Sequence, residues 1–136
     1  MTCCAVIDTN VLVSALLSKR DDTATVQVVE HLLSGEIIPV FSEEILAEYR
    51  DVLMRPKFGF DRGTIDYLLS AVEQFGILLS PSTAEVVLSD MKDLPFYEVA
   101  LEIRDDSGYL VTGNLKHFPK EDFIVTPREM IEILNS

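Results

Sequence analysis

The sequence lacks an apolar run long enough to cross a membrane. A membrane-spanning helix needs roughly 20 consecutive apolar residues, and the apolar runs here are far shorter. No Lys or Arg precedes the first apolar run, as it would in a secretory signal, and neither end carries a lipidation pattern. We therefore expect a protein without a membrane anchor that works in the cytoplasm.

Cysteines are scarce as well. Cys3 and Cys4 are the only two, and neighbours in a strand point to opposite faces of the sheet. Neither a disulfide between them nor a zinc site is expected. Reduced, packed thiols are typical of a cytoplasmic protein.

Basic residues are few, because 11 Lys and Arg stand against 23 Asp and Glu, for a net charge of -12. Proteins that bind nucleic acid directly through their own surface, without bound cations, are usually basic, because Lys and Arg displace the counterions of the phosphates. An acidic chain better fits basic partners, or substrates held through bound cations. No P-loop or dinucleotide fingerprint is present either, so a nucleotide-binding loop is not expected.

The composition that is present indicates a globular domain. Of the 136 residues, 48% are hydrophobic and 25% charged, which is ordinary for a folded protein. The length suits one hydrophobic core, and no repeat, low-complexity tract or long linker interrupts the chain. We expect a single domain over residues 1–136.

Short apolar segments alternate with segments of helical periodicity. Ser42 is a candidate N-cap, Gly35 and Gly76 are candidate helix ends, and Pro127 suits a first helical position. Strands are expected over 3–7, 36–41, 77–80, 108–113 and 122–126, and helices over 10–18, 23–35, 43–55, 61–76, 95–103 and 127–135. Apolar strands that alternate with helices predict an α/β fold, a three-layer α/β/α sandwich with a mainly parallel central sheet.

Three acidic residues can meet at one edge of this sheet. Asp8 ends the first strand, between two segments suited to a core, and an unpaired carboxylate there costs several kcal/mol to bury. Glu48 borders the apolar stripe of the helix after the second strand, and Asp93 precedes the helix that starts near Leu94. In parallel sheets the functional crevice lies outside the carboxyl ends of the strands.

Converging carboxylates raise one another's pKa unless a cation neutralises them. Oxygen ligands select Mg2+ or Mn2+, and such a centre suits phosphodiester hydrolysis. Simpler roles stay open at this point. Asp93 also suits an N-cap, and spacing alone favours an ordinary surface role for Glu48.

The two histidines give weaker signals. His31 falls in an amphipathic helix and His117 in a loop, and neither has the spacing of a metal pair or of a base beside a nucleophile. Structural or surface roles are expected for both. The segments "RPKFGFDR" and "LKHFPK" combine basic and aromatic residues that suit a phosphate backbone, although solvated loop charges are the simpler explanation.

Four segments, "AVIDTNVLVSALLS", "SEEILAEYRDVLMRPKF", "DMKDLPFYEVA" and "GYLVTGNLKHFP", together resemble the PIN domain. The closest likeness is to small PIN proteins that are the toxins of toxin-antitoxin systems, including the VapC type. This resemblance implies a metal-dependent endoribonuclease that uses Mg2+ or Mn2+. It also implies a homodimer and an inhibitory antitoxin partner, with RNA as the substrate and DNA as a further option for the fold.

Carried over to this chain, the resemblance implies Asp8, Glu48 and Asp93 as metal ligands. PIN nucleases often have a fourth acid in the turn after the fourth strand, where this sequence has Asn114. An amide contributes no negative charge, so a second metal ion should be held less firmly. Thr112 and Asn10 are expected to support the site, Thr112 by bonding a water or phosphate and Asn10 by orienting Asp8, unless both serve only as turn and capping residues.

Two other classes of function are alternatives to this one. Aspartyl-phosphate phosphatases of the haloacid dehalogenase type need a second Asp two residues after the first, where Asn10 stands, and receiver domains need a set of acids and a Lys that the chain does not supply. A PIN-like module that binds without cutting is the stronger alternative, because Asn114 and the acidic charge both favour it.

Overall fold

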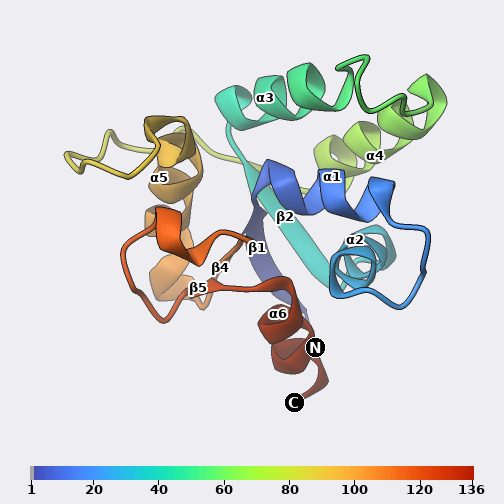
Figure 1. Cartoon of the computed structure of the whole chain (residues 1–136). Coiled ribbons are helices and arrows are strands. Elements are labelled where there is room, and N and C mark those ends of the chain that lie inside the picture. The colour runs from blue at the N-terminus through green and yellow to red at the C-terminus, as the bar shows by residue number, and fades with distance from the viewer. Residues whose placement is uncertain (1) are drawn as a thin grey trace.

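Five parallel strands form the centre of the fold in the computed structural model, which describes residues 2–136 (Figure 1). Met1 lies outside the described residues. The strands are β1 (Cys3–Ile7), β2 (Ile37–Phe41), β3 (Ile77–Leu78), β4 (Tyr109–Val111) and β5 (Ile124–Val125). The α-helices are α1 (Thr9–Leu17), α2 (Ala24–Ser34), α3 (Glu43–Leu53), α4 (Arg62–Phe75), α5 (Leu94–Ile103) and α6 (Pro127–Asn135). Three short 3-10 helices are η1 (Met91–Asp93), η2 (Arg104–Asp106) and η3 (Leu115–His117).

The strand order β3-β2-β1-β4-β5 places β1 in the middle of the sheet. All neighbouring strands are parallel, and Ile7 of β1 is in register with Val111 of β4. Since both strands end at these residues, Asp8 and Thr112 emerge side by side at the carboxyl edge. The topology therefore brings together two residues from opposite ends of the sequence.

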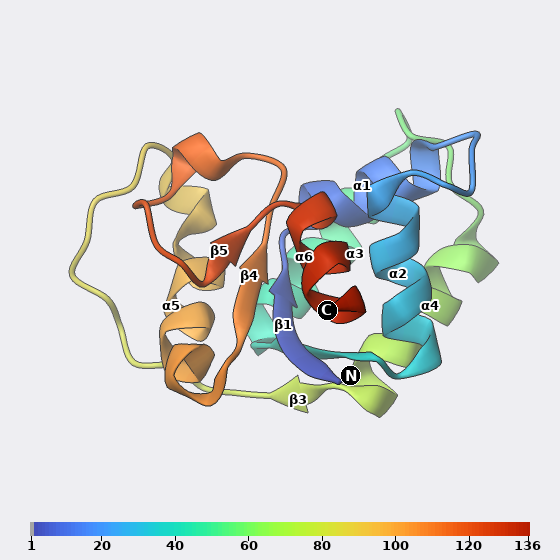
Figure 2. The same cartoon turned by 90° about the horizontal axis from the view of Figure 1, so that it is seen from below.

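Helices cover both faces of the sheet. Helix α5 packs on β1, β2 and β4, whereas α2 packs on β2 and contacts α1 and α6. Figure 2 shows α5 on one side of β1 and β4, and α2 with α6 on the other. The predicted three-layer α/β/α sandwich with a parallel sheet is confirmed.

Local sequence signals set the helix boundaries. The Ser42 hydroxyl accepts a hydrogen bond from the backbone N–H of Ile45 and so caps α3. Gly35 ends α2 in the left-handed conformation, with φ of 88°. Thr126 and Glu129 form a reciprocal capping box at the start of α6. These boundaries agree with the predicted ones because each depends on residues within one helical turn.

The strands at the edges of the sheet are shorter than predicted. Both β3 and β5 have two residues, and each pairs with a neighbour on one side only. In β2, pairing with β3 begins at Val40, one residue after Pro39, which has no N–H to donate. Residues 79–90 have no regular structure beyond β3, but two backbone N–H groups, those of Ser82 and Ala84, donate to glutamates of α5.

Both cysteines are free thiols, with Cys3 buried and Cys4 partly buried. In residues 2–136, no helix combines the length and the apolarity that crossing a membrane requires.

Candidate functional site

Asp8 is a buried carboxyl group at the junction of β1 and α1, with 5% of its surface exposed. It occupies the N-cap position of α1, yet its side chain makes no capping hydrogen bond. The Oδ2 atom instead accepts a 2.7 Å hydrogen bond from Thr112 Oγ1. The side chain is therefore held by the neighbouring strand end rather than used to start its own helix.

Burial raises the pKa of Asp8 to about 6. The Thr112 hydrogen bond works against this rise, whereas the negative charges of Asp93 and Glu48 add to it. Both other predicted acids thus lie near enough to act on Asp8. The arrangement concentrates negative charge at one end of the sheet, where a cation would be stabilised.

Glu48 reaches this region from the middle of α3. Its Oε2 accepts a hydrogen bond of 2.5 Å from Thr9 Oγ1, and Thr9 directly follows Asp8 in the chain. The next residue of α3, Tyr49, is buried and donates from its hydroxyl to the backbone carbonyl of Ile7. Two successive residues of α3 therefore bind the β1–α1 junction, and Glu48 is not a freely solvated surface carboxylate.

Asp93 occupies the N-cap position of α5, but its side chain makes no capping hydrogen bond. The preceding short helix η1 is capped by Asp90, whose side chain accepts a hydrogen bond from the backbone N–H of Lys92. Asp93 Oδ2 lies 3.0 Å from Nδ1 of His117. Burial raises the pKa of Asp93, and the hydrogen bond from His117 opposes that rise. Asp93 therefore holds the expected N-cap position, but its side chain bonds His117 instead of capping the helix.

The turn after β4 is organised by Thr112, which is fully buried. Besides donating to Asp8, its hydroxyl accepts from the backbone N–H of Asn114 at 3.0 Å. The hydroxyl is thus already bonded to protein groups, although it was expected to face a water or a phosphate. The side chain of Asn114 is exposed and makes no hydrogen bond within residues 2–136.

Asn10 lies beneath the same turn. Its Oδ1 atom is buried and has no hydrogen-bond partner in the described part of the chain. A side chain added at Gly113 would place its Cβ 3.9 Å from this atom. A buried amide oxygen without a donor costs about 1–3 kcal/mol, so a ligand or water beside Asn10 would be stabilised.

The donor set fits a hard divalent cation. The charges of Glu48 and Asp93 act on Asp8, and burial gives Asp8 a raised pKa that a cation would lower. Asn10 adds an amide oxygen that has no hydrogen-bond partner within residues 2–136. Among residues 2–136, no three His, Cys, Asp or Glu side chains form a ready-made metal cluster. The case for a metal centre therefore rests on the chemistry and charge of these donors.

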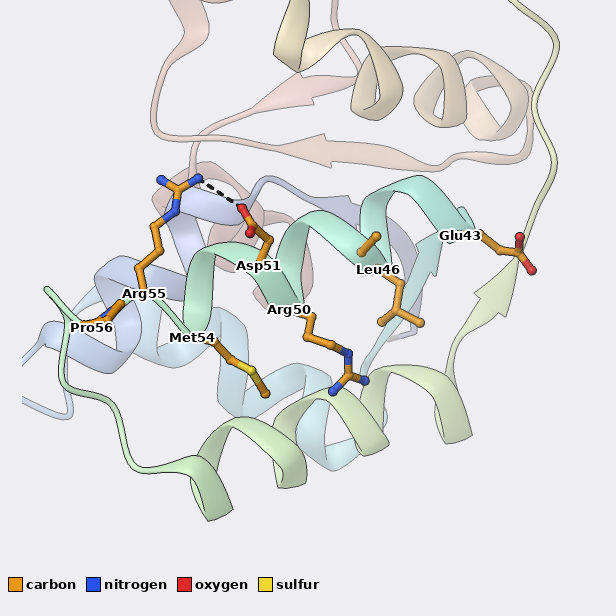
Figure 3. A pocket seen from close by; sticks show the side chains of 8 residues that line it. Glu43, Leu46, Arg50, Asp51, Met54, Arg55 and Pro56 are labelled. Carbon is orange, nitrogen blue, oxygen red and sulfur yellow. Dashed lines mark hydrogen bonds and ion pairs between the residues drawn. The ribbon is translucent and has the colours of Figure 1, made fainter.

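Two hollows lie beside the parts of the chain that carry Glu48 and Asn114. One of about 650 Å3 follows the exposed side of α3. In Figure 3, Arg50 and Met54 point toward α4, whereas the ion pair of Arg55 and Asp51 lies on the other side of α3. None of the three acids lines this hollow. A second, of about 400 Å3, is lined by residues 113–117 and Thr126, and it adjoins the turn that carries Asn114.

Sequence reasoning missed three contacts of the site. Thr9 and Tyr49 were not singled out, although each is the immediate neighbour of a predicted ligand. His117 was expected to have only a structural or surface role, yet its ring contacts Asp93. The signal that would have found it is the proximity of the turn after β4 to the start of α5, since α5 packs directly on β4.

Comparison with known families agrees with this geometry. A family model described as the PIN domain matches residues 4–116, a range that contains all three acids and Asn114. No curated protein matches the sequence. PIN domains are typically metal-dependent nucleases that use divalent ions. The match extends over most of the chain, and the chain therefore belongs to the PIN domain family.

Proposed function

We propose that this protein is a Mg2+- or Mn2+-dependent endoribonuclease, built as a single domain over residues 1–136. Asp8, Glu48 and Asp93 hold the ion, and Asn114 assists them. One observation carries the proposal: burial raises the pKa of the Asp8 carboxyl group, and the negative charges of Asp93 and Glu48 add to that rise. A divalent cation bound between these carboxylates would neutralise their mutual repulsion and stabilise their ionised forms.

A bound ion supplies an activated water and stabilises the charge that develops on the phosphate oxygens. The chain's own residues prepare the site. Thr112 holds Asp8, and Thr9 holds Glu48, each through one carboxylate oxygen. In this proposal Asn114, which is exposed on the turn, orients a phosphate or a water by hydrogen bonds, and no residue forms a covalent intermediate.

RNA as the substrate and a toxin role rest on the resemblance to small toxin-type PIN proteins. The net charge of -12 supports a basic inhibitory partner, because opposite charge favours association. We accordingly propose a cognate antitoxin, a homodimer and a cytoplasmic location as parts of the same function. Finding an antitoxin gene beside this one would support the toxin role directly.

The function is tested with a mixed RNA pool incubated with Mg2+ or Mn2+, with and without EDTA. The wild type is compared with Asp8→Ala and Glu48→Ala, and Glu44→Ala is the matched control because Glu44 is an exposed acid on the same helix. We expect metal-dependent cutting by the wild type and the control alone. Cutting that survives EDTA or both site substitutions would contradict the proposal.

A second candidate is a PIN-like module that binds nucleic acid without cutting it. The observation that favours it is Asn114, which contributes no charge where many PIN nucleases have a fourth acid. This candidate predicts metal binding without turnover. A folded wild type that binds Mn2+, is free of copurified inhibitor and cuts neither RNA nor DNA pools would establish it.

A further inference from the structure

His117 makes a specific contact with one of the three acids. Its Nδ1 lies 3.0 Å from Asp93 Oδ2, across 24 residues of sequence. A carboxylate can only accept hydrogen bonds, so Nδ1 carries the proton that is shared. The Asp93 side chain is 15% exposed and that of His117 is 40% exposed, which places the contact at the lip of the site rather than on the open surface.

The backbone that carries His117 is anchored on both sides. Its N–H donates to the carbonyl of Asn114 at 3.0 Å, within the short helix η3. The next residue, Phe118, is buried, and its ring packs on Tyr97 of α5 with 6.4 Å between centroids. Two successive residues of this loop thus dock on α5, the helix that Asp93 begins. The fold therefore builds the contact, which does not depend on a chance rotamer of a mobile loop.

The contact repeats a pattern seen at the other two acids. Each acid has one carboxylate oxygen that is hydrogen-bonded by another side chain. Thr112 bonds Asp8, Thr9 bonds Glu48, and His117 bonds Asp93. Each donor comes from a different element than the acid it holds. Within residues 2–136, the second oxygens of Glu48 and Asp93 receive no hydrogen bond.

We propose that His117 is a positioning residue that holds Asp93 Oδ2, so that the remaining oxygen of Asp93 is oriented to bind a divalent cation. The inference rests on the proposed function and adds a supporting residue to it. Removing a group that orients a metal ligand typically weakens metal binding about 10–100-fold. Removing His117 would leave metal affinity unchanged if its contact with Asp93 were only a surface ion pair.

The chain offers a matched control pair. His31 Nδ1 lies 2.7 Å from Glu36 Oε1 and so has the same chemistry as the His117 contact. This pair joins the end of α2 to the start of β2, at the opposite edge of the sheet from Asp8. Its loss removes a histidine–carboxylate contact without touching the acids of the site.

The experiment measures Mn2+ binding to the metal-free protein by calorimetry, without RNA. We expect His117→Ala to weaken Mn2+ binding about 10–100-fold and His31→Ala to leave it unchanged. His117→Asn should restore most of the affinity, because the Asn amide N–H occupies nearly the place of Nδ1. His117→Gln, whose amide corresponds to Nε2 instead, should not restore it.

Equal Mn2+ affinity in His117→Ala and the wild type would overturn the inference while leaving the metal site intact. Should His117→Ala unfold, the other two variants decide: tighter binding by His117→Asn than by His117→Gln supports positioning, and equal binding overturns it. A folded wild type that binds no Mn2+ would overturn the proposed function itself, which distinguishes the two failures.

Discussion

The hydroxyl of Thr112 donates a 2.7 Å hydrogen bond to the carboxyl group of Asp8, although 104 residues separate the two in the sequence. The pair forms because β1 and β4 are parallel neighbours that end at the same level. The same hydroxyl accepts the backbone N–H of Asn114. One buried side chain therefore positions both the central acid and the turn beside it.

Replacing Thr112 with Val should destabilise the protein. Val has nearly the same shape, but it leaves the N–H of Asn114 and the carboxyl group of Asp8 without their partner. The loss of a buried hydrogen bond of this kind costs about 1–3 kcal/mol. The measurement is urea unfolding of the metal-free protein at neutral pH.

Thr112→Ser is the control for that change, because it keeps the hydroxyl and removes only a methyl group. We expect it to retain more stability than Thr112→Val. If Val proved as stable as the wild type, the hydrogen bonds of Thr112 would have no net effect on folding.

Replacing Asp8 with Asn should stabilise the metal-free protein at neutral pH. The folded pKa of Asp8, about 6, lies above its ordinary value of 3.8. The folded state therefore binds the proton more tightly, and stability falls as the pH rises from about 4 to about 6. A difference of this size corresponds to about 3 kcal/mol at pH 7, and the Asn variant avoids that cost.

The gain from Asp8→Asn should shrink as the pH falls and vanish below about pH 4, where Asp8 is neutral in both states. The measurement is the free energy of unfolding of the wild type and the variant by urea, in EDTA, at several pH values. A variant that is less stable than the wild type at pH 8, or a gain that is the same at pH 4, would show that the burial of Asp8 is compensated in another way.

Mn2+ should raise the thermal stability of the wild type, because a ligand that binds only the folded state shifts unfolding by mass action. At a free concentration 100 times the Kd, the stabilisation is about 2.7 kcal/mol. Differential scanning fluorimetry with and without EDTA measures the change. Glu44→Ala should keep the shift, and Asp8→Ala should lose it.

Gly76→Ala should be strongly destabilising, for a reason unrelated to the site. A Cβ there would lie 2.5 Å from the backbone oxygen of Pro39 and closer still to that of Val72. Neither atom can move without shifting β2 or α4, and overpacking of this kind costs about 1–3 kcal/mol. Gly113→Ala is the comparison in urea unfolding, since its Cβ would meet only Asn10 Oδ1 at 3.9 Å. Equal losses would contradict the steric argument.

Local sequence signals were sufficient to predict the helix boundaries. Ser42, Gly35 and Thr126 act on groups within one turn, and the structure uses all three at helix ends. The edge strands β3 and β5 were overestimated, because apolar residues continue past the point where a neighbour is available to pair. Strand length depends on the partner strand, which the segment itself does not describe.

The sequence by itself determined the alternation of strands and helices, the parallel sheet, and the arrival of Asp8 at its carboxyl edge, because these follow from residues close together in the chain. Only the tertiary structure decided what each acid touches. The three contacts join residues that are 24 to 104 positions apart in the sequence: Thr9 with Glu48, Thr112 with Asp8, and His117 with Asp93. Such contacts depend on how whole elements pack, and no local pattern specifies that packing.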